Sequence, residues 1–292
     1  MNYIIKNGDM SFTISTLGAE LISAKNASGD EFIWQANPDF WSDHAPLLFP
    51  VCGRLKGFYY MYKGKRYDMG IHGFLRHLEF KVVSSSDTQI TLSVSENEET
   101  LKQYPFKFTV TVTYKAENCT LLSTYTVKND SEELMPFAFG LHPGFNVFTE
   151  GGITVNDYRV IFDKSAALRR TPLSEYPNGP EFLPTEFENS ALKIDNDAIA
   201  AIDTIVLKNV GTHTRLVCDK SNHEIEMSFS ENLPLYCIWK NPSMEAQYLC
   251  LEPWTTEPAR YVDEEDLSTR KNMIPLASGK SESFFCNFTF KK

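Results

Sequence analysis

The sequence predicts an all-β protein, built as an antiparallel sandwich or barrel with few and short helices. Short segments of alternating apolar and polar residues recur along the chain, and turn-forming residues separate them. Such alternation is the period of a strand with one buried face. Helical periodicity is weak, and no repeat of fixed length indicates a propeller or a solenoid.

The clearest alternation covers residues 106–114, where aromatic residues and valine occupy every second position and lysine or threonine the positions between. A turn at 115–118 and a partner strand at 120–127 complete a hairpin. A second hairpin is predicted at 78–94, with its tip at 84–87, where three serines precede an aspartate.

The remaining elements are shorter. Further strands are predicted at residues 11–15, 20–26, 31–35, 204–207, 215–218, 224–229, 235–239, 248–251 and 283–290. Helical turns are predicted at 98–103 and 263–267. Residues 172–184 hold four prolines and little periodicity, which indicates a surface loop. Because strand patterning resumes on both sides without a change in composition, we expect one domain over residues 1–292.

Charge and cysteine usage limit the classes of partner. The net charge of −10 argues against binding to nucleic acid or to an anionic membrane. The chain lacks an apolar leader and any run of ~18 apolar residues, so neither export nor a membrane span is expected. The six cysteines are scattered without a Cys-x-x-Cys pair. They indicate reduced thiols in a cytoplasmic protein and argue against a thiolate metal site.

Common cofactor and nucleophile motifs are absent from the sequence. There is no Gly-x-Ser-x-Gly, no phosphate-binding glycine loop and no dinucleotide fingerprint. The only close pair of histidines, His72 and His77, is five residues apart, which does not suit metal binding. We therefore expect neither a metal nor an organic cofactor.

Two clusters carry candidate proton-transfer groups. Pro143 biases His142 towards extended geometry and Gly144 permits a turn, so the imidazole is predicted at a strand end. Glu252 ends an apolar run, where burial would raise its pKa towards that of a useful base. Trp254 offers a flat surface for the C–H groups of a sugar. The alternative is that His142 caps a core edge and has no chemical role.

Four more residues have a functional and a structural interpretation. Arg54 follows a proline-bracketed apolar run and Gly53, and it either points into a cleft or lies on the surface. His72 precedes a glycine, which is more often a structural position, and Arg76 follows in the same basic patch. Asp203 opens a predicted strand and, taken alone, is a turn residue.

Six blocks in order resemble the aldose 1-epimerase (galactose mutarotase) superfamily, and more closely its bacterial LacX-like branch. They cover nearly the whole chain and lie at residues 17–21, 33–35, 48–54, 72–74, 142–145 and 251–254. The resemblance implies a large antiparallel β supersandwich with a shallow cleft on its face, and no metal or organic cofactor.

The resemblance also implies roles. Glu252 would be the general base for the anomeric hydroxyl and His142 the general acid for the ring oxygen, so that the ring opens to the aldehyde and closes on either face. His72 and Arg54 would hold ring oxygens, and Asp203 would hydrogen-bond a sugar hydroxyl. We expect folding to bring the imidazole and the carboxylate to opposite edges of one pyranose-sized hollow.

Two alternatives to a hexose 1-epimerase stay open. A hexose-6-phosphate 1-epimerase would use Arg76 with Arg54 to clamp the phosphate, and a non-catalytic protein of the same fold would bind sugar without turnover. Residues 255–260 depart from the glycine-containing pattern expected after the glutamate, which leaves the sugar undetermined. The sequence specifies neither the pathway nor whether the protein is a monomer or a homodimer.

Overall fold

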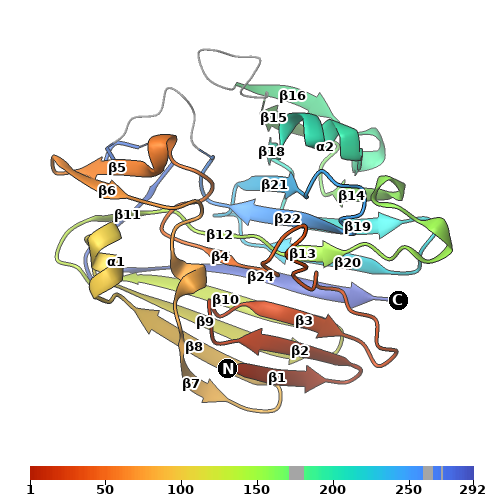
Figure 1. Cartoon of the computed structure of the whole chain (residues 1–292), viewed down its shortest axis with the longest axis horizontal. Helices are drawn as coiled ribbons and strands as arrows, with labels where there is room; N and C mark the ends of the chain where they lie inside the picture. The colour runs from red at the N-terminus through yellow and green to blue at the C-terminus, as the bar shows by residue number, and fades with distance from the viewer. Residues whose placement is uncertain (171–180, 259–265, 271) are drawn as a thin grey trace.

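Two large antiparallel β-sheets face each other and form most of the molecule (Figure 1). The computed structural model describes residues 1–170, 181–258, 266–270 and 272–292. Within these ranges every pairing between named strands is antiparallel, and only two short α-helices are present. The prediction of an all-β antiparallel fold is confirmed.

The first sheet has nine strands in the order β17-β14-β19-β20-β24-β10-β9-β8-β7. In that order they are Ala191–Lys193, Tyr158–Phe162, His213–Cys218, Glu224–Phe229, Ser281–Lys291, Thr120–Asn129, Phe108–Glu117, Gln89–Ser95 and Lys81–Ser85. In β9, Phe108, Val110 and Val112 are buried, and the threonines between them are partly exposed. The predicted hairpin of β9 and β10 therefore forms because one face of each strand buries its apolar side chains.

The second sheet has eight strands and carries the candidate site. Its order is β16-β15-β18-β21-β22-β12-β4, and β13 also pairs with β22. In that order they are Phe182–Glu186, Ala166–Arg170, Ile205–Lys208, Leu235–Trp239, Tyr248–Trp254, Gly140–Leu141 and Leu47–Leu48, with β13 at Gly144–Asn146. Strand β22 is buried at every residue, because it has neighbours on both edges and on both faces.

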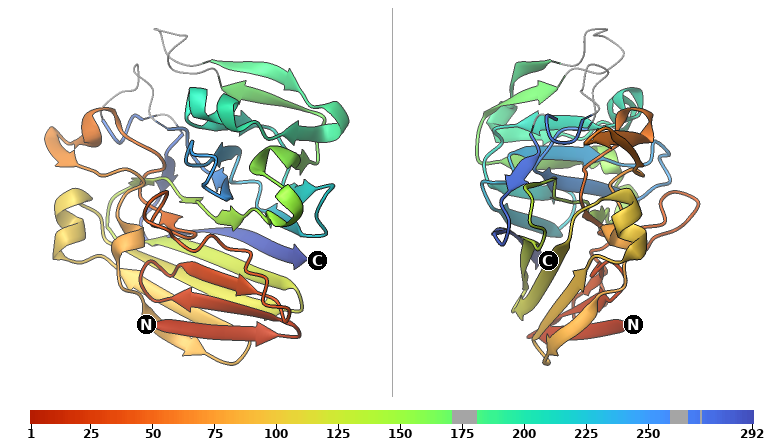
Figure 2. Two further views of the ribbon diagram at one scale, coloured as in Figure 1. Left: turned by 45° about the vertical axis from the view of Figure 1, so that its right-hand side comes forward. Right: turned by 90° about the vertical axis from the view of Figure 1, so that its left-hand side faces the viewer.

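Smaller sheets cover the edges of the two large ones (Figure 2). The N-terminal sheet consists of β1 (Asn2–Asn7), β2 (Met10–Ser15) and β3 (Leu21–Lys25). It is tied to β9 by the hydroxyl of Tyr114, which donates to the carbonyl of Ala19 at 2.9 Å. Two further pairs are β5 (Tyr59–Tyr62) with β6 (Lys65–Asp68), and β11 (Met135–Phe137) with β23 (Ile274–Leu276).

Aromatic side chains fill the space between the two large sheets. Phe139 stacks on Phe284 of β24 with ring centroids 4.9 Å apart, and Phe145 of β13 lies 5.9 Å from Phe288. One cluster of buried side chains extends from Ile5 to Phe290. Burial on this scale makes the eight-stranded sheet a rigid support for side chains on its other face.

The helices are short. Helix α1 (Glu98–Gln103) begins as predicted, with the Asn97 side chain accepting from two backbone N–H groups. Helix α2 (Asn196–Ile202) was not predicted and is capped by Asp195 in the same way. Turns of 3-10 helix occur at Lys56–Phe58, Leu75–His77, Glu150–Gly152, Val155–Asp157 and Glu188–Ser190. Among the described residues no helix has the length and apolar character needed to cross a bilayer.

Three local predictions differ from the structure or fall partly outside it. Residues 31–35 form isolated bridges and no strand, because their backbone groups bond in turn to β13 and to the carboxylate of Glu31. The proline-rich loop predicted at 172–184 is wrong from Phe182 onward, where β16 forms the sheet edge; Pro184 is tolerated there because an edge strand has free N–H positions. The rest of that loop and most of the turn predicted at 263–267 lie outside the described residues.

Candidate active site

Strand β22 provides the carboxylate of the site. Along this strand Leu249 and Leu251 belong to the main core between the sheets. Cys250 and Trp254 lie in other clusters, on the opposite face, and the period of a strand places Glu252 with them. The face of the sheet away from the main core therefore carries the acid between a thiol and an indole.

His142 lies opposite Glu252 because the chain passes along the same edge of β22 twice. Gly140 in β12 pairs with Trp254, and Gly144 in β13 pairs with Cys250, so the residue midway between them faces position 252. Neither glycine has room for a side chain. A Cβ atom on Gly140 would lie 2.6 Å from Trp254, and one on Gly144 would lie 2.6 Å from Trp41.

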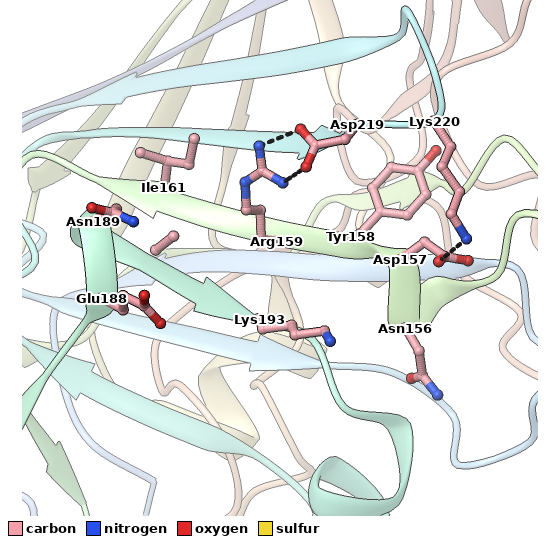
Figure 3. Close-up of a pocket in the computed structure, with 11 residues that line it drawn as sticks. Asn156, Asp157, Tyr158, Arg159, Ile161, Glu188, Asn189, Lys193, Asp219 and Lys220 are labelled. Carbon is pink, nitrogen blue, oxygen red and sulfur yellow. Dashed lines mark hydrogen bonds and ion pairs between the residues drawn. The ribbon is translucent and has the colours of Figure 1, made fainter.

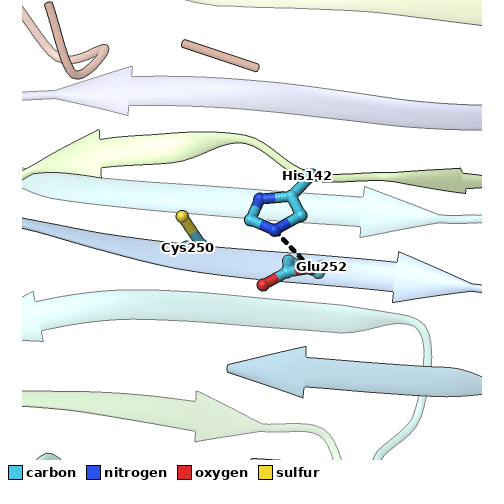
Figure 4. Close-up of side chains that lie close together, drawn as sticks. All are labelled: His142, Cys250 and Glu252. Atoms are coloured by element: carbon cyan, nitrogen blue, oxygen red, sulfur yellow. Dashed lines mark ion pairs between the residues drawn. The ribbon is translucent and has the colours of Figure 1, made fainter. Parts of the chain in front are cut away.

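The prediction that the imidazole and the carboxylate lie at opposite edges of one hollow is wrong, because β12 and β13 pair along the same edge of β22 and bring the two side chains into direct contact (Figure 4). Nε2 of His142 lies 3.2 Å from Oε2 of Glu252, and the side chains are 8% and 1% exposed. Within the described residues neither carboxylate oxygen of Glu252 accepts a hydrogen bond, and Nδ1 of His142 has no hydrogen-bond partner, so the contact of 3.2 Å is an ion-pair distance and not a hydrogen bond. Burying a polar atom without a hydrogen-bond partner costs free energy, so these unpaired atoms mark a candidate site for binding or catalysis.

Burial moves the two pKa values in opposite directions. It raises the pKa of Glu252 well above the ordinary value, with the charge of Asp203 adding to the effect. It lowers the pKa of His142 well below the ordinary value, with His72 and Arg76 adding to the effect. Both shifts favour the neutral forms, a carboxylic acid at Glu252 and a neutral imidazole at His142.

Indole rings surround the pair. The ring of Trp41 lies 5.0 Å from that of His142, and the ring of Trp239 lies 5.7 Å from it. Trp254, the residue predicted to stack on a sugar, is buried and donates from Nε1 to the carbonyl of Leu141. Trp41 and Trp239 are partly exposed and supply open aromatic surface. They were not predicted from the sequence, because neither lies in one of the six blocks that resemble the family.

His72 stands at right angles to His142, with ring centroids 5.2 Å apart. Its Nδ1 accepts from the backbone N–H of Gly53 at 3.0 Å, so in the neutral ring the proton is on Nε2. Burial, helped by the charges of Arg76 and Arg54, lowers the pKa of His72 to about 3. The ring is therefore a neutral donor at physiological pH.

Close packing against the backbone of Phe49 fixes the loop that carries His72. His72 has a φ of 64°, and at Gly73, with a φ of 72°, a Cβ atom would lie 2.1 Å from the carbonyl oxygen of Phe49. Only glycine allows the two segments to approach this closely. The sequence block around Phe49 and the block around His72 are therefore one structural unit.

Arg76 and Asp203 act on the pair through their charges, whereas the charge of Arg54 acts on His72. Arg54 is exposed and its guanidinium lies over the ring of Phe58 at 5.3 Å. Asp203 is exposed at the end of α2. Arg76 is occupied, because its Nη1 bonds Asp43 at 3.0 Å. That ion pair was not predicted from the sequence.

A second charged group lies on the neighbouring strands. Lys208 of β18 bonds Glu257 at 2.7 Å and lies over the ring of Phe182 at 3.8 Å. Glu257 belongs to the segment that departs from the family pattern. The first residues of that segment are buried, with Thr255 bonded to Phe139, and its last two lie outside the described residues.

One group of side chains could hold a metal ion. Ligand atoms of His142, Cys250 and Glu252 all lie within 4.8 Å of one another, and all three side chains are buried. No metal site was predicted from the sequence, because that prediction rested on the spacing of the histidines and of the cysteines, and His142 is more than 100 residues from Cys250 and Glu252.

A separate open hollow of about 650 Å³ lies over β14, away from the pair (Figure 3). None of the predicted site residues lines it. Four of its charged side chains form two ion pairs, Arg159 with Asp219 and Lys220 with Asp157. We assign no chemistry to this hollow.

Comparison with known proteins gives one consistent result. The family model described as aldose 1-epimerase matches residues 1–289. Protein LacX, chromosomal, from Lactococcus lactis subsp. lactis is 28% identical over 272 residues, which cover 87% of this chain and 88% of that protein. The structure of a galactose mutarotase related enzyme from Lactobacillus acidophilus has a TM-score of 0.91 and 34% identity, covering 100% of this chain and 98% of that one. A galactose mutarotase-like protein from Lactobacillus casei has a TM-score of 0.91 and 29% identity, covering 99% and 100%.

Proposed function

The chain belongs to the aldose 1-epimerase family, as its sequence blocks predicted, and we propose that it interconverts the α and β anomers of a hexose by general acid–base catalysis. The observation that carries the proposal is the contact of 3.2 Å between Nε2 of His142 and Oε2 of Glu252 in a buried, aromatic-lined corner. A proton donor and a proton acceptor at such a position can transfer protons to and from a hemiacetal.

The proposed reaction begins with the carboxylate and imidazolium form of the pair. Glu252 takes the proton of the anomeric hydroxyl while His142 gives its proton to the ring oxygen. The bond from the anomeric carbon to the ring oxygen breaks, and the anomeric carbon becomes the carbonyl carbon of the open aldehyde. Rotation about the C1–C2 bond and reversal of both transfers then give the other anomer.

Direct contact between the acid and the base suits this reaction. The anomeric hydroxyl and the ring oxygen are bonded to the same carbon, so the two catalytic groups must reach neighbouring atoms. Ring opening leaves the pair as a carboxylic acid and a neutral imidazole, the form that burial favours. The contact also allows the proton to return from Glu252 to His142 without passing through solvent.

The surrounding groups would bind and polarise the sugar. We propose that the Nε2–H of His72 donates to a sugar oxygen, since its Nδ1 is already occupied by Gly53. Arg54 would stabilise negative charge that develops on the opening hemiacetal. Trp41 and Trp239, with Trp254 behind them, would exclude water and contact the apolar face of the ring.

We propose an unphosphorylated hexose as the substrate. A phosphate clamp would need Arg76 together with Arg54, and Arg76 is occupied by Asp43. The negative charges of Asp43 and Asp203 near the site would also oppose a phosphorylated sugar. All six cysteines are unpaired, which supports the proposal of a reducing, cytoplasmic location.

Polarimetry tests the proposal. Freshly dissolved α-glucose or α-galactose is followed to equilibrium with and without the protein, and a faster approach at the same final rotation is expected. The anomers of glucose 6-phosphate are followed in parallel, and a slower catalysed rate is expected there. Absence of acceleration on every aldose tested, with sugar binding still seen by calorimetry, would replace the proposal with a non-catalytic binding role.

A further inference from the structure

Cys250 has no part in the proposed reaction, yet it lies beside both catalytic groups. It is two residues from Glu252 on β22, so both side chains project from the same face of the sheet. Its strand partner Gly144 follows His142 by two residues on the neighbouring chain segment. The thiol, the imidazole and the carboxylate therefore converge from two adjacent strands, and their ligand atoms lie within 4.8 Å of one another (Figure 4).

These three donors are the kinds that zinc prefers. Zinc binds imidazole nitrogen, thiolate sulfur and carboxylate oxygen in a tetrahedron, and three protein ligands leave a fourth position open. With bonds of ~2.0–2.3 Å, two ligand atoms of one ion lie roughly 3.3–3.8 Å apart. Small rotations of side chains that already lie within 4.8 Å of one another would close the site. Magnesium and calcium prefer six or more oxygen ligands, which this corner does not offer.

A second observation also indicates a missing partner. Oε1 of Glu252 has no hydrogen-bond donor among the described residues, although the side chain is 1% exposed. No lysine or arginine contacts this carboxylate within the same residues. A buried carboxylate is strongly stabilised by a cation that it contacts directly.

We propose that His142, Cys250 and Glu252 form an inhibitory site for a borderline or soft divalent cation, with zinc as the ion that fits best. The ion is an inhibitor and not a cofactor, because it occupies the nitrogen and the oxygen that must carry protons. Binding displaces the proton shared by the pair and the thiol proton to the buffer, and no redox change occurs. The inhibitory consequence rests on the proposed epimerase function, whereas binding itself does not.

Cobalt provides a readout that is independent of activity. Co²⁺ accepts the same ligand types as zinc, and a bond from thiolate to cobalt gives an intense charge-transfer band in the near ultraviolet. Metal-free protein with reduced thiols is titrated with CoCl₂ in a buffer that does not chelate metals. A band that saturates at one equivalent, and that zinc then abolishes, is expected.

Variants locate the bound ion. Cys250→Ser removes the proposed ligand, and Cys218→Ser is the matched control, since Cys218 is a buried thiol on β19 of the other sheet. The band should vanish in the first variant and persist in the second. If Cys250→Ser does not fold, Cys250→Ala serves, because it leaves no buried hydroxyl without a partner. No band in the wild-type protein, or a band that persists without Cys250, overturns the proposal.

Inhibition is measured in the polarimetric assay with zinc, and with magnesium as the hard-ion control. We expect zinc to compete with sugar and magnesium to have no effect. Each variant is compared with its own zinc-free rate. Loss of an outer partner of a metal ligand costs ~10–100-fold in affinity, so loss of the thiolate is expected to weaken inhibition at least about 100-fold. A protein that binds cobalt but never accelerates anomerisation would disprove the proposed function and leave the metal site standing.

Discussion

Among the described residues, two buried histidines each lie beside a carboxylate, and the two pairs differ in what surrounds the acid. Nε2 of His142 lies 3.2 Å from Glu252, and Nε2 of His223 lies 3.4 Å from Asp30. Each imidazole is almost fully buried beside an aromatic ring, and His223 stacks on Phe148 at 3.6 Å.

The acids differ in their other partners. Asp30 accepts hydrogen bonds from Lys292 at 2.8 Å and Asn26 at 2.7 Å, and these bonds lower the pKa of Asp30 to about 2. Glu252 has no such donors among the described residues, and burial raises its pKa. Asp30 therefore keeps its negative charge and binds Lys292. In the other pair, we propose that a proton moves between His142 and Glu252. The difference between the structural pair and the proposed catalytic pair therefore depends on the other partners of the acid, and not on the histidine.

The largest expected effect comes from replacing each acid with its amide. Glu252→Gln should lower kcat by ~10³-fold or more, because the base is lost, yet change the free energy of unfolding by less than about 1 kcal/mol, since the native side chain is already neutral in the resting protein. Polarimetry and chemical denaturation measure the two quantities. Asp30→Asn should show the reverse, with kcat within about twofold of the wild type. Equal losses of kcat in both variants would end the distinction between the pairs.

Replacing each imidazole should repeat this contrast at a smaller scale. His142→Asn is expected to lower kcat by ~10²-fold, because a general acid contributes about that much. His223→Asn should leave kcat unchanged and lower the free energy of unfolding by about 1–3 kcal/mol, since it removes a ring stacked on Phe148. A large loss of activity in the His223 variant would contradict the structural role assigned here.

The pH profile of kcat/KM sharpens the comparison further. The active pair holds one proton, so the rate should be flat between the lowered pKa of His142 and the raised pKa of Glu252. It should fall at acid pH as a second proton binds, and at alkaline pH as the only proton leaves. With ordinary pKa values of 4.5 and 6.5 the rate would instead decline about tenfold per pH unit above 6.5. Polarimetry corrected for buffer catalysis separates these profiles.

The smallest expected effect concerns stability at acid pH. The folded pKa of Asp30 is depressed from 3.8 to about 2, so its contribution is complete above 3.8 and is lost as the pH falls through 2. After allowance for solvent screening we expect about 1 kcal/mol. Lys292→Ala should remove part of this dependence without affecting kcat. Denaturation curves between pH 5 and 2 measure it, and an unchanged slope in the Asp30→Asn variant would contradict it.

Strands were predictable where one face is buried and the other is open. Residues 224–229 and 235–239 match β20 and β21 at both ends, because alternation or a continuous apolar run marks them. The strand at 248–251 was predicted to end at Leu251, because a Glu-Pro sequence is typical of a strand end. In the structure β22 continues to Trp254, because it has buried neighbours on both sides. Helix α2 was missed although Asp195 is a good cap, because seven residues give little helical period.

His142 and Glu252 were candidates from their local sequence, but a joint role for them was predicted only through resemblance to a family. Nothing in the spacing of positions 142 and 252 requires contact; the pairing of Gly140 and Gly144 with β22 produces it. Trp41 and Asp43 reach the site from a segment without a sequence pattern of its own, so the indole wall and the partner of Arg76 were missed. Long-range register decides these contacts, and a single sequence does not display it.

The alternation along β22 places a limit on how this protein can evolve. Positions 250, 252 and 254 lie on the face that carries the proposed site, while 249 and 251 belong to the core between the sheets. Inserting or deleting one residue within the strand would exchange the two sets and put a leucine where the carboxylate stands. Drift in this segment is therefore confined to replacements that keep its length.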